Sequence, residues 1–261
     1  MNERGNQHTT VEVGNWDIQE VPYVYSELCV KNWAPWMVAP MDSIIGRVNV
    51  FTEGQLLARN EKKIPIGYAF INQINWNGQN QDLKSWREIA GEPTTFEDTY
   101  SPDGNTLVLM SINVHSDFRG IGVARKLIEN AKSLANRHDI DFLIGSFRPN
   151  QYGAFKIDNP GFSDFEAYCR MVKNDGLPID EWLRNLTLNG MRIIKEDTEA
   201  MIGNFSVDEF NNFRANYNPS SWVETEPNIW ECGEVGRWII DPNTNIASYI
   251  ENAIWGQIEL N

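Results

Sequence analysis

The chain has 261 residues, 41% hydrophobic and 22% charged, a composition typical of a globular protein and not of a disordered one. Its 22 basic and 36 acidic side chains give a net charge of −14, which argues against nucleic acid and anionic membranes as partners. No run of 18 apolar residues and no basic-then-apolar leader is present, so we expect a cytoplasmic protein without a membrane segment.

The cysteines and histidines are few and scattered. No CxxC pair occurs, so we expect neither a disulfide framework nor a structural metal site, and we expect the cysteines to be buried by packing. The residues concerned are Cys29, Cys169, Cys232, His8, His115 and His138.

The first hundred residues predict helices followed by a hairpin. Residues 1–20 suggest a loose tail or a first strand, residues 21–36 a helix with a turn, and Asp42 or Ser43 a cap for a second helix that ends near Phe51. Two strands are expected at 55–60 and 65–76, joined by a polar turn at 60–63, and a polar excursion is expected at 77–105.

The middle of the chain predicts a strand, a glycine-rich turn, a helix and a second strand. Residues 106–114 are almost all apolar, as in a strand buried on both faces, and an apolar stripe of helical period begins at Val123. Residues 142–147 form the next strand, so this segment is a βαβ-like unit.

The last third of the chain has a less regular pattern. Helices are expected at 165–172 and 179–188, with Asp164 and Asp180 as capping or first-turn acids. A further helix is expected at 207–216, and strands are expected at 235–240 and 247–255.

The glycine-rich turn carries the clearest chemical signal. Residues 119–122 read Arg-Gly-Ile-Gly, and glycines at a helix start let a ligand approach free backbone N–H groups. Arg119, Arg125 and Lys126 add positive charge in an acidic chain. The segment is therefore either a pyrophosphate site or an ordinary strand-to-helix turn in which glycine permits the bend.

Two familiar phosphate motifs do not fit this turn. No Gly-Lys-Ser/Thr follows the glycines, which excludes a Walker A loop. Arg125 occupies the third glycine position of a dinucleotide fingerprint, and the acids Asp139 and Asp141 precede the following strand instead of ending it.

Residues 119–124, Arg-Gly-Ile-Gly-Val-Ala, resemble the (Arg/Gln)-x-x-Gly-x-(Gly/Ala) signature of the GNAT superfamily of acyl-CoA-dependent acyltransferases. Asn150 and the pair Gly161-Phe162 are spaced like the second motif of that superfamily. A bacterial GNAT subgroup, sometimes fused to a carbon–nitrogen hydrolase domain, is similar in residues 51–56, 86–89, 101–107, 175–178 and 182–184.

The resemblance implies an α+β fold with a central mixed, splayed β-sheet flanked by helices. It implies one GNAT-type domain over residues 1–261, with a core at about 21–165 and a C-terminal extension at 166–261 that completes the sheet and the acceptor pocket. The implied co-substrate is acetyl-CoA or another acyl-CoA. By position, its implied binding residues are Ile112, Asn113 and Val114 for the pantetheine, Gly120, Ile121, Gly122, Val123 and Ala124 for the pyrophosphate, and Arg119, Arg125 and Asn150 beside them.

The implied chemistry is direct attack of a neutral amine on the thioester, with a base, backbone donors for the oxyanion and an acid for the thiolate. The tyrosine that serves many members as the acid is replaced by Ile157, which leaves Tyr152 or, as a second choice, Tyr168. The candidates for the base are Glu53, Glu88, His115 and a water chain to a backbone carbonyl. Trp76 and Trp86 are expected to shape the acceptor pocket.

Three functions remain open. The first is an N-acyltransferase for a small-molecule or peptide amine. The second is a domain of the same fold that loads an acyl group on an acyl carrier protein, for which the resemblance implies a histidine–threonine pair that residues 142–147 do not supply. The third is an acyl-CoA-binding module without turnover, which the replacement at Ile157 suggests. Many superfamily members are dimers, so a homodimer is a further expectation.

Overall fold

The computed structural model describes residues 10–260. The strands are β1 (Glu12–Asn15), β2 (Gln55–Arg59), β3 (Pro65–Ile74), β4 (Thr106–Val114), β5 (Phe142–Phe147), β6 (Met191–Ser206), β7 (Val223–Glu226), β8 (Ile229–Glu231), β9 (Arg237–Asp241) and β10 (Ile246–Ile258). The helices are α1 (Val21–Val24), α2 (Val30–Asn32), α3 (Met41–Val50), α4 (Trp86–Ala90), α5 (Val123–Arg137), α6 (Tyr152–Asp158), α7 (Phe165–Arg170), α8 (Glu181–Leu188) and α9 (Val207–Asn216).

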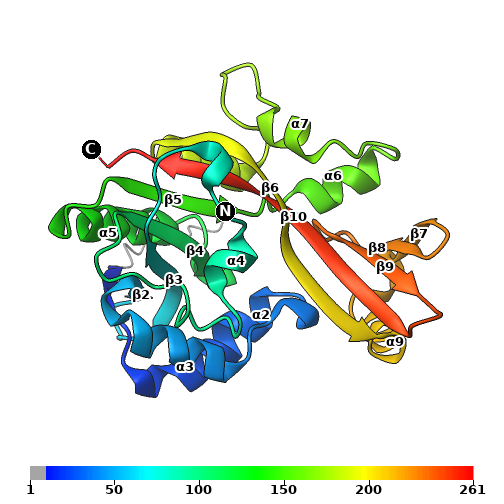
Figure 1. Ribbon diagram of the computed structural model, residues 1–261, viewed down its shortest axis with the longest axis horizontal. Helices are drawn as coiled ribbons and strands as arrows, with labels where there is room; N and C mark the ends of the chain where they lie inside the picture. Colours follow the sequence, from blue (N-terminus) through cyan, green and yellow to red (C-terminus); the bar gives the residue numbers. More distant parts are fainter. Residues whose placement is uncertain (1–9, 261) are drawn as a thin grey trace, which may run out of the picture.

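One mixed sheet holds all of these strands in the order β1-β2-β3-β4-β5-β10-β9-β8-β7, with β6 on the other edge of β10. The pair β4 and β5 is parallel, and its neighbours in the sheet are antiparallel. Strand β10 joins two groups of strands, because residues 254–258 pair with β5 and residues 246–250 pair with β9. Figure 1 shows β6 and β10 running side by side from the first group of strands to the second.

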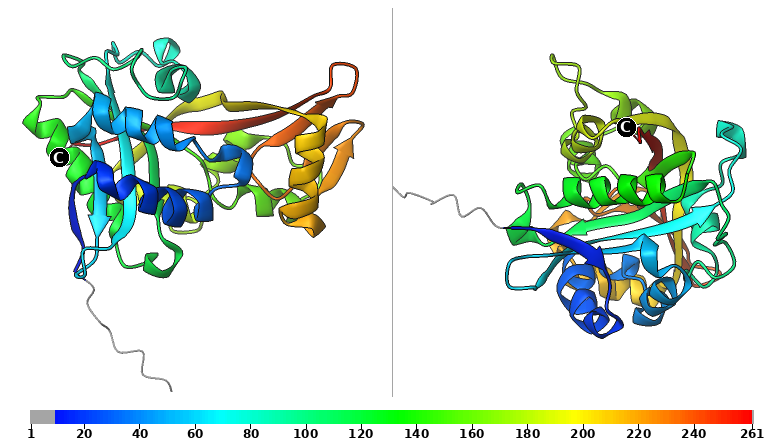
Figure 2. Two further views of the ribbon diagram at one scale, coloured as in Figure 1. Left: turned by 90° about the horizontal axis from the view of Figure 1, so that it is seen from below. Right: turned by 90° about the vertical axis from the view of Figure 1, so that its left-hand side faces the viewer.

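Helices cover both faces of the first group of strands. Figure 2 shows α5 on one face and the helices of the first fifty residues on the other. The apolar stripe of α5, which includes Leu127, Ile128 and Leu134, is fully buried against the sheet. The opposite face is covered by a cluster that includes Leu28 and Ile44. Burial on both faces explains why β3 and β4 are apolar almost throughout.

A third cluster of apolar side chains lies at the far end of β6 and β10. Trp238 is completely buried there, and the rings of Trp36, Phe205 and Phe210 pack against it. Trp36 comes from the turn before α3, so this cluster connects the N-terminal helices with the C-terminal strands. Several of the ten tryptophans therefore serve packing.

The predicted mixed α+β class is confirmed, and the predicted strands and helices occur with small changes in their ends. Asp164 and Asp180 cap α7 and α8, and the three cysteines are buried and unpaired, as expected. The predicted cap of α3 is wrong: Pro40 holds that position, and Asp42 lies in the first turn. The tail expected at residues 1–9 lies outside the described residues.

Three strands were not predicted, and β6 is the largest of them. Its side chains are partly exposed on both faces, so its sequence lacks the alternation that identifies a strand. Two irregularities in its register with β10 disturb the alternation further. Strands β7 and β8 are short; β7 forms the edge of the sheet with β8 next to it, and β7 is exposed throughout.

Candidate functional site

The site begins where β4 and β5 separate. These parallel strands pair from Thr106 with Phe142 to Leu109 with Gly145, and β4 continues for five residues without that partner. The register with β3 shifts at the same place, because Phe70 pairs with Ser111 and Ile71 with Leu109. Such a bulge bends a strand, and here it directs β4 away from β5. One edge of residues 110–114 is thus left without a neighbouring strand.

This separation opens a long space between the strands, which we call the strand groove; its volume is about 1150 Å³. The end of β4, the start of α5 and side chains of α8 line it. Nearly all of the residues predicted to bind the co-substrate meet there: Ile112, Asn113, Val114, Arg119, Gly120, Gly122, Val123, Ala124, Arg125 and Asn150. Ile121 is the exception, because its half-exposed side chain does not line the strand groove.

The glycine turn at the mouth of the strand groove is shaped for close approach. Gly120 and Gly122 have φ angles of +80° and +89°, a region that favours glycine. A methyl group built on either residue would meet no atom within 4 Å, so both glycines face open space. The N–H groups of residues 120–125 form no hydrogen bond in the described part of the chain. Free N–H groups at the start of a fifteen-residue helix attract an anion.

The strand groove carries a small excess of positive charge, although the chain as a whole is acidic. Arg119, Arg125, Lys132 and Arg148 line it, against the carboxylates Glu129, Glu181 and Glu259. This balance of four cations to three anions contrasts with the net charge of −14 for the chain. Arg119 donates to Asn32 at 3.0 Å, which holds it beside the turn, and Arg125 pairs with Glu129 at 2.8 Å. Lys126 does not contribute, because its ammonium group donates to the carbonyl of Val11.

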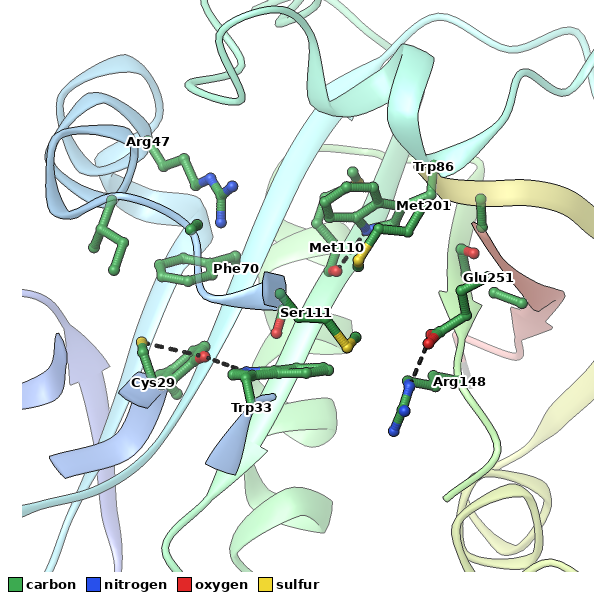
Figure 3. Close-up of a pocket in the computed structure, with 17 residues that line it drawn as sticks. Cys29, Trp33, Arg47, Phe70, Trp86, Met110, Ser111, Arg148, Met201 and Glu251 are labelled. Carbon is green, nitrogen blue, oxygen red and sulfur yellow. Dashed lines mark hydrogen bonds and ion pairs between the residues drawn. The ribbon is translucent and has the colours of Figure 1, made fainter. Parts of the chain in front are cut away.

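A second space, which we call the inner cavity, adjoins the strand groove and has a volume of about 100 Å³. Both spaces are lined by Trp33, Met110, Ser111, Ser146 and Arg148, so these residues mark the junction. Beyond the junction the inner cavity is mainly apolar, with Ile44, Phe70 and Met201 in its wall. Figure 3 shows Arg47 on one side of it and the pair Arg148 and Glu251 on the other.

Arg148 is held at the junction by two carboxylates. Its Nε donates to Glu251 at 2.7 Å, and its Nη2 pairs with Glu234. Tyr249 donates to the other oxygen of Glu251, and Tyr217 donates to Glu234 at 2.6 Å. Burial raises the pKa of Glu251, although Arg148 opposes the effect. Burial alone would lower the pKa of Arg148, but the two carboxylates raise it.

Ser146 and Asp197 form a second polar pair at the junction. The hydroxyl of Ser146 donates to Asp197 at 2.6 Å, and the backbone N–H of Trp86 donates to the same carboxylate oxygen at 3.0 Å. Burial raises the pKa of Asp197 to about 6, although these hydrogen bonds lower it. Ser146 thus connects a carboxylate of raised pKa to both spaces.

The catalytic residues suggested by the sequence lie elsewhere. The hydroxyl of Tyr152 has no hydrogen-bond partner in the described residues, and its ring packs against Phe165 and Tyr168 in the core. Glu53 is bonded to His138 at 2.8 Å, and His115 accepts from the backbone of Asp117. None of Tyr152, Glu53 and His115 lines the strand groove or the inner cavity.

The remaining candidates also have structural roles. Glu88 accepts from Ser85 in the capping box of α4, which lowers the pKa of Glu88, and Tyr168 donates to Asp180. Trp76 packs on Phe142 away from both spaces, whereas Trp86 lines the inner cavity. Ile157, in the position of the usual tyrosine, is 56% exposed and lines neither space.

Sequence reasoning missed Arg47, Glu251 and Asp197, although two of them left a signal. Arg47 follows Ile44 by three residues and precedes Val48 by one, so it lies on the apolar stripe of α3. Glu251 alternates with Tyr249 and Ala253 along β10 and therefore points toward the core. A charge on a buried face is a candidate for function.

Comparison with known proteins agrees with this geometry. Residues 13–153 match the acetyltransferase (GNAT) family, which is more than half of the chain. The chain belongs to the GNAT family of acetyltransferases. Membership supports an acyltransferase that uses a CoA thioester, and it agrees with the resemblance seen in residues 119–124.

Two solved structures are similar over nearly the whole chain. The loading GNATL domain of CurA from Lyngbya majuscula has a TM-score of 0.62 at 12% identity, covering 96% of this chain and 98% of that one. The GphF GNAT-like decarboxylase in complex with isobutyryl-CoA has a TM-score of 0.63 at 16% identity, covering 96% and 100%. At such identities the likeness concerns the fold.

Among curated proteins, the probable hydrolase YhcX of Bacillus subtilis (strain 168) is 27% identical over 125 residues. The match covers 48% of this chain and 23% of that protein, so the two share one segment. No helix within residues 10–260 is long and apolar enough to cross a membrane. The same residues contain no group of three His, Cys, Asp or Glu side chains suited to a metal ion.

Proposed function

We propose that this protein is an acyl-CoA-dependent N-acyltransferase that acts on a small-molecule amine. The observation that carries the proposal is the junction, where the strand groove meets an inner cavity that contains a buried carboxylate, Glu251. An elongated donor in the groove and a small acceptor in the cavity would meet at Ser111, Ser146 and Arg148.

The residues of the strand groove fit acyl-CoA. The free edge of β4 at Ile112–Val114 offers backbone groups to the amides of pantetheine, as a neighbouring strand would. The unbonded N–H groups of residues 120–125 suit the pyrophosphate, and Gly120 and Gly122 leave room for it. Acyl-CoA supplies the activated thioester; binding and proton transfer are left to the protein.

Glu251 is the residue best placed to accept a proton from the amine. It is the only carboxylate among the described residues that line the inner cavity. Its raised pKa makes it a better proton acceptor than an exposed glutamate, and Arg148 and Tyr249 fix its orientation. We assign it the role of general base in place of Glu53 and His115.

Ser146 is the residue best placed to donate a proton to the departing sulfur. Ser146 lines both spaces, and its hydroxyl is bonded to Asp197, whose raised pKa of about 6 favours the neutral carboxyl; that form can replace the proton that Ser146 gives to the sulfur. We therefore assign the acid role to the Ser146–Asp197 pair and not to Tyr152. Backbone N–H groups at the bulge of β4 are the candidate donors to the oxyanion.

The second candidate is transfer of an acyl group to a carrier-protein thiol. Two structures that resemble nearly the whole chain are a loading domain and a GNAT-like decarboxylase. This similarity favours the carrier-protein candidate over an acetyltransferase of smaller size. Against it, neither His115 nor His138 lines the strand groove or the inner cavity, and β5 contains no histidine for the histidine–threonine pair that this chemistry is expected to use. His8 lies outside the described residues.

A thiol-release assay with acyl-CoAs and a panel of amines tests the proposal. We expect amine-dependent release of CoA, and we expect Glu251→Gln to lower kcat by roughly 100-fold or more with little change in CoA affinity. Glu196→Gln is the control, because Glu196 bonds to Asn252 and lines neither space. Acyl transfer to a carrier protein without transfer to any amine would favour the second candidate.

A further inference from the structure

The inner cavity contains an arginine that the proposed chemistry does not use. Arg47 lies on α3, and its side chain is 4% exposed. It lines the cavity beside Ile44 and Phe70. Figure 3 shows its side chain reaching from α3 over the ring of Phe70. A buried cation is costly unless a carboxylate or a full set of hydrogen bonds compensates it.

Arg47 has no such compensation within the described residues. Its Nε donates to the carbonyl of Thr94 at 2.7 Å, and neither Nη atom has a hydrogen-bond partner. The guanidinium carbon lies 5.0 Å from the ring centre of Phe70 and 5.2 Å from that of Phe96. Burial lowers the pKa of Arg47 to about 10, and no carboxylate opposes the change. The group therefore remains charged at neutral pH.

Arg148, across the cavity, shows the contrast. It is paired with Glu251 and Glu234, so its charge is more than balanced. Arg47 thus supplies the uncompensated positive charge of the inner cavity, in a chain whose overall charge repels anions. The two aromatic rings hold the guanidinium plane while leaving its outer nitrogens unbonded.

We propose that Arg47 binds the carboxylate of a small-molecule reactant in the inner cavity. The inference rests on the proposed function, since it names the substrate class of the same site. A guanidinium fork matches a carboxylate with two parallel charge-assisted hydrogen bonds. One uncompensated cation in an apolar wall suits a single negative charge. The carboxylate belongs either to the acceptor, as in an amino acid, or to the acyl group, as in the monothioester of a dicarboxylic acid.

Matched substrate pairs in the wild-type protein distinguish the two sources. For the acceptor, L-leucine is compared with 3-methylbutylamine and L-phenylalanine with 2-phenylethylamine, all with acetyl-CoA. For the acyl group, succinyl-CoA is compared with butyryl-CoA, using one amine. In one of the two arms we expect kcat/KM for the carboxylate member to exceed that of its partner by roughly 10- to 100-fold, as for hydrogen bonds to charged groups.

Arg47→Met tests whether this preference depends on the guanidinium, and we expect it to abolish the preference. Arg214→Met is the matched control, because Arg214 also stacks on two aromatic rings, Phe210 and Trp230, but lines neither space. The control should keep the preference. Circular dichroism and CoA binding verify that both variants are folded.

Two results would overturn the inference: equal kcat/KM within every wild-type pair, or a preference that survives in Arg47→Met. Equal kcat/KM within every wild-type pair rejects the inference even if the variant does not fold. Calorimetric titration of the same pairs separates this inference from the proposed function. If no acyl transfer occurs, carboxylate-selective binding that requires Arg47 would still support the site, and equal binding would reject it.

Discussion

Replacing Gly122 by alanine separates a turn that merely bends the chain from one that holds a ligand. The φ angle of +89° is unfavourable for alanine by about 1–2 kcal/mol. The new methyl group would meet no atom within 4 Å, so no steric clash adds to that strain. For a chain of this size, 1 kcal/mol lowers Tm by roughly 2–4 °C, so a fall of about 2–8 °C is expected.

The same substitution should also weaken ligand binding. The methyl group would occupy the space in which the pyrophosphate approaches the N–H groups of residues 120–125. We expect calorimetric titration to show CoA affinity reduced at least about tenfold, which corresponds to 1.4 kcal/mol. The bulkier Gly122→Trp should abolish binding while the protein still folds.

Gly176→Ala is the matched control for this experiment. Gly176 has a φ angle of +80° and the same open surroundings, but it lies in the turn after α7 and lines neither space. Both alanine variants should lose similar stability, and only Gly122→Ala should lose CoA affinity. Wild-type CoA affinity in a folded Gly122→Ala protein would refute the assignment of the glycine turn.

Two further predictions concern Asp197 and Tyr152. Asp197 has a pKa of about 6 in the folded protein, against an ordinary value of 3.8. When Asp197 is ionised in both states, this difference lowers the free energy of unfolding by about 3 kcal/mol. Because the folded-state pKa is raised, this penalty is full above about pH 6 and disappears below about pH 4, so Asp197→Asn should gain stability relative to wild type as pH rises. Urea unfolding at several pH values measures it, and a pH-independent difference would contradict it. Tyr152→Phe should leave turnover unchanged, because the hydroxyl lines neither space; a clear fall in kcat would restore its catalytic role.

The sequence was sufficient to predict the centre of the fold and the residues of the strand groove, where the acyl-CoA donor is proposed to bind. The strand at 106–114, the glycine turn and α5 are contiguous, and their apolar periods and backbone requirements are local properties of the chain. The residues that line the strand groove near this turn could therefore be named in advance. Because these residues are contiguous in the sequence, the GNAT signature could be identified without knowledge of any tertiary contact.

Only the tertiary structure revealed the inner cavity, which is the proposed acceptor site. Arg47, Ser146, Asp197 and Glu251 come from α3, β5, β6 and β10. The proximity of the last three depends on sheet pairings such as that of Ile258 with Leu143, whose partners lie more than one hundred residues apart in the sequence. The sequence suggested acids and bases by their position near motifs. In the structure Glu53 pairs with His138 at the surface, His115 accepts from the neighbouring backbone, and Tyr152 packs in the core. Long-range strand pairing has no local signature, so a site assembled by β6 and β10 becomes visible only when the sheet is complete.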